Sequence, residues 1–344
     1  MPQHNMPENW EPPYPAWSVE FAPDVRVVVV GYFAAQFKNS SVDEFKGWMR
    51  LALSIDNAPL HHLQATYTDV EGYTNHVCIC YWTSQESYNS WAALPPVTTW
   101  WNDPARLNGE VGYWREIVFA PMERLETLFS SEDVAGMATL ASRVTGPVRE
   151  HAYWGAMRDR MPASDYNDFS SKFGDRLIRL PEVESRGQRV RITPPENICL
   201  IRSAQDWTQC KDGELDIYQN DVHPVLIEGM NFIRDNPSET GCISCRLMDE
   251  LTETGDKQAK TFGMAYFLTM AHLEAWVKSH PTHLAIFRSF HTMVKQLDFQ
   301  LDLRLWHEVI VLPQGEHVFE YFNCHEKTGL LPFFSPVGGT DVSH

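Results

Sequence analysis

The segment 266–283 reads YFLTMAHLEAWVKSHPTH, and its spacing recurs earlier in the chain as YWTSQESYNSWAALPPVT at 81–98. In both segments an aromatic pair ends a run of strand-forming residues, and a tryptophan lies ten residues after the tyrosine. A proline stands five residues after each tryptophan, where it favours the first turn of a new helix. Two segments that share this spacing without a gap indicate that one structural unit occurs twice.

The elements expected around these segments follow a similar order in both halves of the chain. Runs rich in β-branched and aromatic residues indicate strands, and apolar residues at helical spacing indicate the helices between them. The order strand, helix, strand, helix, strand is close to that of a ferredoxin-like half. The expected strands are 27–33, 76–82, 112–119, 198–203, 241–248, 260–267 and 303–311. One helix is expected to begin near residue 42, three others to lie at 84–94, 221–235 and 271–277, and a further one to follow residue 281.

We therefore predict an α+β fold with duplicated ferredoxin-like halves, antiparallel sheets and flanking helices. At 344 residues the chain is long enough for one large domain or two domains of ordinary size, each able to bury its own core. The expected division is an N-terminal tail at 1–20, a first half at 21–125, a connecting segment at 126–195, a second half at 196–335 and a C-terminal tail at 336–344.

The composition argues against several classes of partner. The formal net charge of −17 at pH 7 disfavours nucleic acid and anionic membranes, because both require a basic face. Residues 1–14 are polar and proline-rich without the apolar core of a signal peptide, and no run of about 18 apolar residues occurs. Seven cysteines in a long chain suit reduced thiols better than a disulfide framework. These features predict a cytoplasmic protein.

Cys242 and Cys245 have the CxxC spacing that also occurs in zinc and redox sites. The chain has no second CxxC and no histidine pair at zinc-finger spacing. The segment 241–248 has instead the composition of a buried strand, so we expect both thiols to be part of the core.

Two histidines lie on faces that are otherwise apolar. His283 lies in the first turn of a predicted helix and shares its face with apolar residues further along. The segment 303–311 alternates, so that His307 lies on the same side as Leu305 and Val309. A buried imidazole without a partner costs roughly 1–3 kcal/mol, so each ring needs a hydrogen bond, a ligand or a metal.

The comparison of the two halves shows that these histidines are not part of the repeat. Thr98 stands where His283 stands, and Arg115 stands where His307 stands. A structural role common to both halves would be expected to leave histidine in each. The asymmetry instead favours one functional site in the second half.

The connecting segment contains a dense polar cluster at 150–160, in which six of eleven residues are charged, titratable or hydroxylated. Such a mixture seldom forms a plain core. From composition alone, it is either part of a site or a salt-bridge knot of Arg158, Asp159 and Arg160 that ties the halves together.

Three chemistries compete for these residues. A zinc hydrolase needs three or more ligands at recognisable spacing, and a His-Glu-x-x-His motif is absent. A serine hydrolase built on Ser203 would be expected to have a Gly-x-Ser-x-Gly elbow, which is also absent. A haem pocket has one helix-borne imidazole on iron and a second imidazole opposite it as acid or base. It explains both the apolar surroundings and the restriction of the histidines to one half.

Five ordered blocks of the sequence resemble those of the haem-dependent aldoxime dehydratases. The blocks are HAYWGAMRDR at 151–160, NICLIRSAQDW at 197–207, SHPTH at 279–283, LWHEV at 305–309 and NCH at 323–325. The resemblance extends from about residue 7 to residue 334. It implies halves of the dimeric α+β barrel type, a cytoplasmic homodimer and haem b. It also implies dehydration of an aldoxime, R-CH=N-OH, to a nitrile and water, with ferrous iron binding the oxime nitrogen.

The same resemblance implies roles for five residues. His283, the second histidine of the His-Pro-Thr-His block, would be the proximal iron ligand, and His307 would be the distal catalytic acid and base. Ser203 would hold the oxime oxygen, while Arg160 and Glu126 would orient His307 or bias its protonation. The alternatives on the same scaffold are a haem-binding sensor or carrier and a haem peroxidase-like oxidant.

Overall fold

One antiparallel sheet runs through the part of the chain that the structure describes. The computed structural model describes residues 5–174, 176–182, 184–315 and 317–337. Within them, eleven strands follow the order β6-β12-β9-β11-β10-β3-β4-β2-β5-β13-β8, and β1 pairs separately with β7. The strands are β1 (Ser18–Glu20), β2 (Val27–Phe37), β3 (His61–Thr68), β4 (Thr74–Trp82), β5 (Gly112–Pro121), β6 (Leu125–Phe129), β7 (Arg143–Thr145), β8 (Arg189–Ile192), β9 (Cys199–Asp206), β10 (Cys242–Leu251), β11 (Lys257–Phe267), β12 (Arg304–Val311) and β13 (Val318–Phe322).

Helices connect these strands. The α-helices are α1 (Asp43–Ala52), α2 (Gln85–Ala92), α3 (Pro95–Asn102), α4 (Ala156–Asp159), α5 (Asp212–Ile217), α6 (His223–Asp235), α7 (Pro237–Thr240), α8 (Met270–Ser279) and α9 (Pro281–Gln296). Short 3₁₀ helices lie at Pro104–Leu107, Met122–Arg124, Gly136–Leu140 and Pro162–Asp165, and a π-helical turn at Tyr218–Val222 joins α5 to α6. Pro281 begins α9, as its position in the sequence predicts.

Four strands of each half share one arrangement. In the first half they lie in the order β3-β4-β2-β5, and in the second half in the order β10-β11-β9-β12. In each half, helices follow the first strand and precede the last one. The predicted antiparallel sheets with flanking helices are therefore confirmed. The two halves meet where 249–251 of β10 pair with 64–66 of β3.

Every predicted strand and helix is present, with ends that differ by a few residues. Strand β3 is not predicted by the sequence, because HHLQATYT has no continuous apolar face. It forms because β4 and β10 supply backbone hydrogen bonds on its two sides, which outweighs a weak intrinsic preference.

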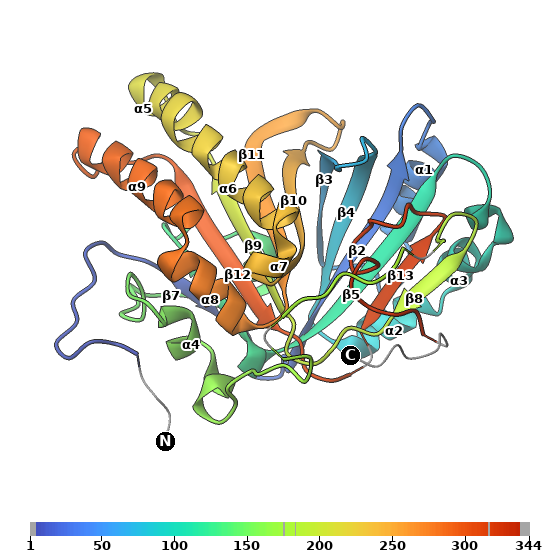
Figure 1. The fold of residues 1–344 in the computed structure, drawn as a ribbon, viewed down its shortest axis with the longest axis horizontal. Coiled ribbons are helices and arrows are strands. Elements are labelled where there is room, and N and C mark those ends of the chain that lie inside the picture. The colour runs from blue at the N-terminus through green and yellow to red at the C-terminus, as the bar shows by residue number, and fades with distance from the viewer. Residues whose placement is uncertain (1–4, 175, 183, 316, 338–344) are drawn as a thin grey trace.

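Helices cover the outer faces of the sheet, and the inner faces of the two halves pack against each other (Figure 1). The core between the halves includes Tyr32 from the first half and Ile310 from the second. Within this core Arg246 donates two hydrogen bonds, of 2.8 and 2.6 Å, to the carboxylate of Glu116. This buried pair links β10 to β5 and therefore joins the halves.

Two parts of the expected connecting segment belong to the large sheet. Strand β6 pairs with β12, and β8 pairs with β13. The position of β6 matters for the site, because it places Glu126 and Leu128 beside the strand that carries His307.

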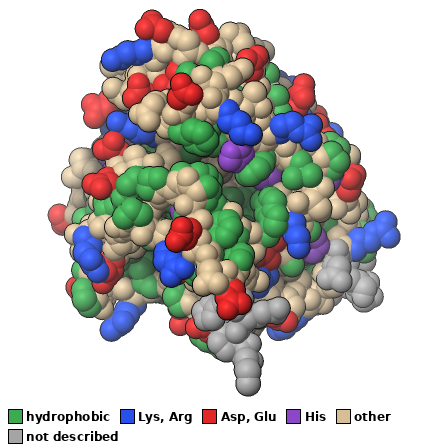
Figure 2. All heavy atoms as spheres, turned by 90° about the vertical axis from the view of Figure 1, so that its left-hand side faces the viewer, with side chains coloured by type: hydrophobic (Ala, Val, Ile, Leu, Met, Phe, Trp, Pro, Cys, Tyr) green, Lys and Arg blue, Asp and Glu red, His purple; other side chains and the backbone are tan. Residues whose placement is uncertain are grey.

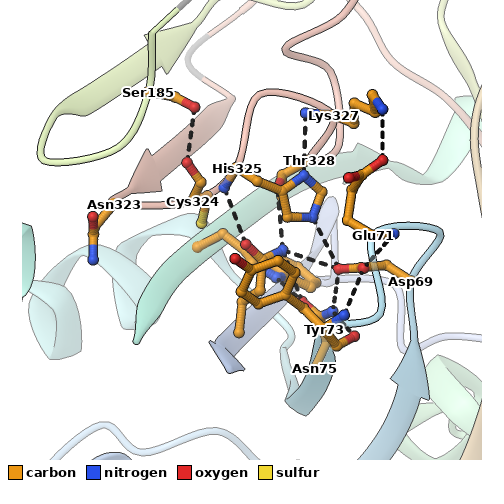
Figure 3. Close-up of polar contacts among 12 residues, drawn as sticks. Asp69, Glu71, Tyr73, Asn75, Ser185, Asn323, Cys324, His325, Lys327 and Thr328 are labelled. Atoms are coloured by element: carbon orange, nitrogen blue, oxygen red, sulfur yellow. Dashed lines mark hydrogen bonds and ion pairs between the residues drawn. The ribbon is translucent and has the colours of Figure 1, made fainter. Parts of the chain in front are cut away.

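The Asn-Cys-His block at 323–325 lies in a buried polar network next to the β3–β4 turn (Figure 3). His325 Nε2 lies 3.0 Å from Asp69 Oδ2, and Gln36 donates a hydrogen bond of 3.1 Å to Thr328. Among the described residues, none of these four lines the cavity that contains His283 and His307. The network fastens the C-terminal segment to the first half.

No helix in the described ranges is long and apolar enough to cross a membrane. All seven cysteines are free and buried. Cys242 and Cys245 lie in β10 as core thiols, which confirms the prediction made for the CxxC pair.

Candidate functional site

A cavity of about 720 Å³ lies in the second half, between the outer face of the sheet and the helices above it. Strands β9, β11 and β12 form one wall, and α6, α8 and α9 form the other. Apolar side chains dominate the lining, and Figure 2 shows hydrophobic side chains gathered around a hollow on this face. They include Leu128, Ile201, Leu226, Met230, Ile233, Ala265, Ile286, Phe290, Leu303 and Leu305.

His283 lines the helical wall of this cavity and lies edge-on to Trp276, with ring centroids 4.7 Å apart. Burial lowers the pKa of His283 to about 4, and the carbonyl of Val277 offsets only part of that effect. The ring is therefore neutral at pH 7, which is the form that binds a metal. Its Nδ1 is buried without a well-aligned hydrogen bond to any described residue, so the ring has an unused nitrogen.

His307 lies on the sheet wall, opposite the helices. It pairs directly with Ser203 on β9 and with Leu128 on β6, and all three side chains line the cavity. The neighbouring residues on β12 point the other way: Glu308 is buried between the halves, with Oε1 3.5 Å from Nη1 of Arg202. The alternation predicted for this strand is confirmed.

Two charged side chains meet one nitrogen of His307. Arg160 Nη2 lies 3.2 Å from Nε2, and Glu126 Oε1 lies 3.0 Å from the same atom. A guanidinium only donates, so in its contact with Arg160 the Nε2 atom is an acceptor and the proton of the neutral ring is on Nδ1. Arg160 also donates a hydrogen bond of 2.7 Å to Glu126 Oε2.

Glu126 Oε1 is buried, and it accepts no hydrogen bond from a described residue other than its 3.0 Å contact with His307 Nε2. It is therefore free to accept from Nε2 once the ring of His307 gains a second proton. The same nitrogen has a partner in both protonation states, Arg160 when it is neutral and Glu126 when it is charged. This arrangement suits a group that gives up a proton and takes one back.

Known proteins resemble this chain over nearly its whole length. A model of the haem-containing dehydratases matches residues 31–330. The chain belongs to this family of haem-containing dehydratases. It is 41% identical over 339 residues to a phenylacetaldoxime dehydratase of Bacillus sp. strain OxB-1, and the match covers 96% of this chain and 94% of the relative.

Two further relatives agree with this assignment to the haem-containing dehydratases. An aliphatic aldoxime dehydratase of Rhodococcus globerulus is 33% identical over 333 residues, which cover 95% of this chain and 92% of the relative. A crystal structure of an aldoxime dehydratase in complex with butyraldoxime superposes with a TM-score of 0.88 at 31% identity, covering 97% of this chain and 93% of that one.

The cavity fits the haem that defines the family. Its volume lies in the range of about 300–1,000 Å³ that is typical of ligand sites, and its walls are apolar. The neutral ring of His283 offers an unshared lone pair, and the Val277 carbonyl lies where the opposite ring nitrogen of an iron-bound histidine commonly finds a partner. Lys278 and the Arg158–Glu274 pair also line the cavity, and an ammonium or guanidinium group can bind a carboxylate such as those of haem.

The polar cluster at 150–160 brings Arg160 to the cavity, and its charged residues do not form a knot with one another. Arg158 donates two hydrogen bonds of 2.9 Å to Glu274 on α8. Asp159 accepts hydrogen bonds from the backbone and side chain of Asn5, at 2.9 to 3.1 Å. Each charge of this short helix therefore has a different partner, and together these contacts hold Arg160 beside the sheet wall.

The ionisation of Glu126 contributes to folding stability. Burial acts to raise the pKa of Glu126, but the charges and hydrogen bonds of Arg160 and His307 outweigh burial and lower the pKa from 4.5 to about 2. A carboxyl group with a lower pKa in the folded chain stabilises the fold while it is ionised. This contribution is fully present above about pH 4.5 and is lost as the pH falls toward 2.

We expect Glu126→Gln to lower the free energy of unfolding by roughly 3 kcal/mol at pH 7 and by progressively less at lower pH. Thermal unfolding followed by circular dichroism between pH 3 and pH 7 tests this. Glu123→Gln, which changes an exposed carboxylate three residues earlier, is the matched control and should have little effect. A loss for Glu126→Gln that does not vary with pH would contradict the linkage.

The five residues predicted from the sequence all lie in or beside this one cavity. The structure adds Leu128, Gly263 and Met230, for which the sequence gives no signal. Their place in the cavity wall follows from the register of the strands and the position of α6, which the sequence does not give.

Proposed function

We propose that this chain dehydrates aldoximes to nitriles and water, with haem b in the ferrous state as its cofactor. The observation that carries the proposal is the position of His307 on the sheet wall across the cavity from the neutral ring of His283, with Ser203 as its direct cross-strand neighbour. Haem held by His283 would supply an iron that can bind the oxime nitrogen and contribute electron density to cleavage of the N–O bond.

The residues of the chain then have separate tasks. His283 would hold the iron from the helical wall. Ser203 would donate or accept a hydrogen bond at the oxime oxygen and so fix its position beside His307. The protonated ring of His307 would give its proton to that oxygen, because hydroxide is a poor leaving group and water a good one.

The second proton transfer restores the starting state. After water has left, the neutral ring of His307 would remove the proton from the oxime carbon, which completes the C≡N bond. No net proton is gained or lost by the protein. Glu126 stabilises the charged ring and Arg160 the neutral one, so both half-reactions have a matching partner.

The direct test is nitrile formation by the haem-loaded protein, reduced with dithionite under anaerobic conditions and supplied with a panel of alkyl and arylalkyl aldoximes. We expect nitrile and no reaction before reduction. Turnover of peroxide without turnover of aldoxime would favour the peroxidase-like alternative. A six-coordinate bis-histidine spectrum that does not respond to aldoxime would favour a sensor or carrier.

We expect Ser203→Ala to lower kcat by about tenfold or more while haem content stays unchanged, because the hydrogen bond to the oxime oxygen is lost without a change in the iron ligand. Thr208→Val is the control, since its hydroxyl bonds to Asp206 at the exposed end of β9. Steady-state nitrile formation measures both variants. Unchanged kcat for Ser203→Ala would remove Ser203 from the catalytic set.

The duplicated ferredoxin-like architecture is our interpretation of the fold, and the equivalent strand orders of the two halves support it. We further propose a homodimer in the cytoplasm. Buried free thiols are compatible with a reducing compartment. Analytical ultracentrifugation of the haem-loaded protein tests the dimer, since a species of 39.6 kDa at micromolar concentration would exclude it.

A further inference from the structure

One level of the sheet carries a row of four cavity residues on adjacent strands. Leu128 pairs with His307, His307 with Ser203, and Ser203 with Gly263. All four line the cavity. Directly opposed residues on one face have their Cβ atoms about 5 Å apart, so the row forms a continuous strip of wall. Gly263 is the member of this row that has no side chain.

The backbone does not require a glycine at position 263. Its φ lies outside the left-handed region, and it sits within the regular pairing of β11 with β9 and β10. A Cβ at this position would approach Met230 Sδ to 2.9 Å, whereas the next nearest atoms would be 3.9 and 4.0 Å away. The space above Gly263 is thus closed by the end of one side chain from α6.

Methionine is suited to a wall that moves. It is unbranched, has three rotatable bonds and carries a polarizable sulfur that packs against many shapes. Met230 Sδ contacts Cys245 Sγ at 3.9 Å and is otherwise held by apolar packing. Its thioether can leave the position above Gly263 without breaking a strong polar contact.

The chemistry of the site directs the substrate toward this position. Ser203 and His307 would hold the hydroxyl group of the oxime, and Leu128 and Gly263 are the positions on this row beside which its carbon substituent can lie. On one side the row continues with Leu128, and on the other side it continues with Gly263, above which the Met230 thioether occupies the space. An apolar substituent gains the most free energy from burial when it lies on the Gly263 side of the pair.

We propose that Gly263 and Met230 together set the size of the oxime substituent that the enzyme accepts. With a short alkyl oxime, Met230 remains above Gly263. A phenylacetaldoxime-sized substituent displaces the thioether and takes its place on the glycine. The inference rests on the proposed function, and it assigns the chain to aldoximes with either alkyl or arylalkyl substituents.

Substitutions at the two positions test this through substrate selectivity. Gly263→Ala should lower kcat/KM for phenylacetaldoxime at least about tenfold relative to acetaldoxime, because the added methyl group occupies the position above residue 263 that the larger substituent would take. Met230→Ala should shift the ratio in the opposite direction. The double variant Gly263→Ala with Met230→Ala should return toward the original ratio, because the two side chains compete for the same space.

Gly213→Ala is the matched control, since Gly213 lies in α5 and a Cβ there would meet no atom within 4 Å. Spectral titration of the haem-loaded protein with acetaldoxime and phenylacetaldoxime measures the same selectivity in binding, independently of turnover. Equal losses for both oximes in Gly263→Ala, in kcat/KM and in binding, would overturn the inference and leave Gly263 a packing role. A wild-type protein that binds both oximes but forms no nitrile would instead overturn the proposed function.

Discussion

Replacement of His283 by alanine is expected to give a folded protein that no longer retains haem. Loss of an outer hydrogen-bond partner of a metal ligand already costs roughly 10- to 100-fold in affinity, and loss of the ligand itself should cost more. The remaining walls of the cavity are mainly apolar, and among the described residues that line its helical side His283 is the only histidine. The ratio of haem to protein after gel filtration, from the Soret absorbance and a pyridine haemochrome assay, measures the loss.

A matched control is available on the same helix. His291 lies two turns further along α9, contacts Phe287 at a ring-centroid distance of 4.1 Å and does not line the cavity. His291→Ala should therefore keep its haem. Added imidazole should restore haem binding to His283→Ala, because the alanine leaves space for the free ring. Stoichiometric haem with an unchanged spectrum in His283→Ala would show that another residue holds the iron.

Replacement of His307 by alanine should separate haem binding from catalysis. The variant keeps the iron ligand, so it should bind haem and still change its spectrum when an aldoxime is added. Nitrile formation should fall by about 100- to 10,000-fold, which is the range for loss of a general acid and base. Arg160 and Glu126 remain paired with each other at 2.7 Å, so the cavity wall should not collapse.

Turnover under anaerobic reduction and spectral titration with the same aldoxime give the two readouts for His307→Ala. His61→Ala, on β3 in the first half, is the control for loss of a partly buried histidine away from the cavity. Near-normal nitrile formation by His307→Ala would exclude it as the acid. Loss of haem from this variant would show that His307 is needed for the cavity itself.

The fold is largely predictable from the sequence because its strongest signals are periodic. The aromatic pairs, tryptophans and prolines of 81–98 and 266–283 place a strand and two helices in each half. Strand β3 escapes prediction because its hydrogen bonds come from neighbours distant in sequence. The pairing of β6 with β12 is also not predictable from the sequence, because a five-residue strand carries little periodic information.

The site is predictable only in part. His283 and His307 stand out because each is a polar residue on an apolar face and neither recurs in the other half. Arg160 and Glu126 are separated by 34 residues, and only the register of β6 against β12 brings the carboxylate to the histidine. Composition alone is equally consistent with a salt-bridge cluster of Arg158, Asp159 and Arg160. In the structure these three residues bind Glu274, Asn5 and Glu126 in turn.

Strand β12 cannot accept an insertion or deletion of one residue without loss of the site. His307 faces the cavity and Glu308 faces the core between the halves, so a single-residue insertion or deletion in the strand would exchange the two environments. It would bury an imidazole beside Arg202 and place a carboxylate among apolar walls. The segment at 297–303 before the strand contains no regular element, but Glu214 accepts hydrogen bonds from the backbone N–H groups of Asp302 and Leu303. Within the strand, an insertion or deletion of one residue would remove His307 from the cavity and destabilise the core between the halves at the same time.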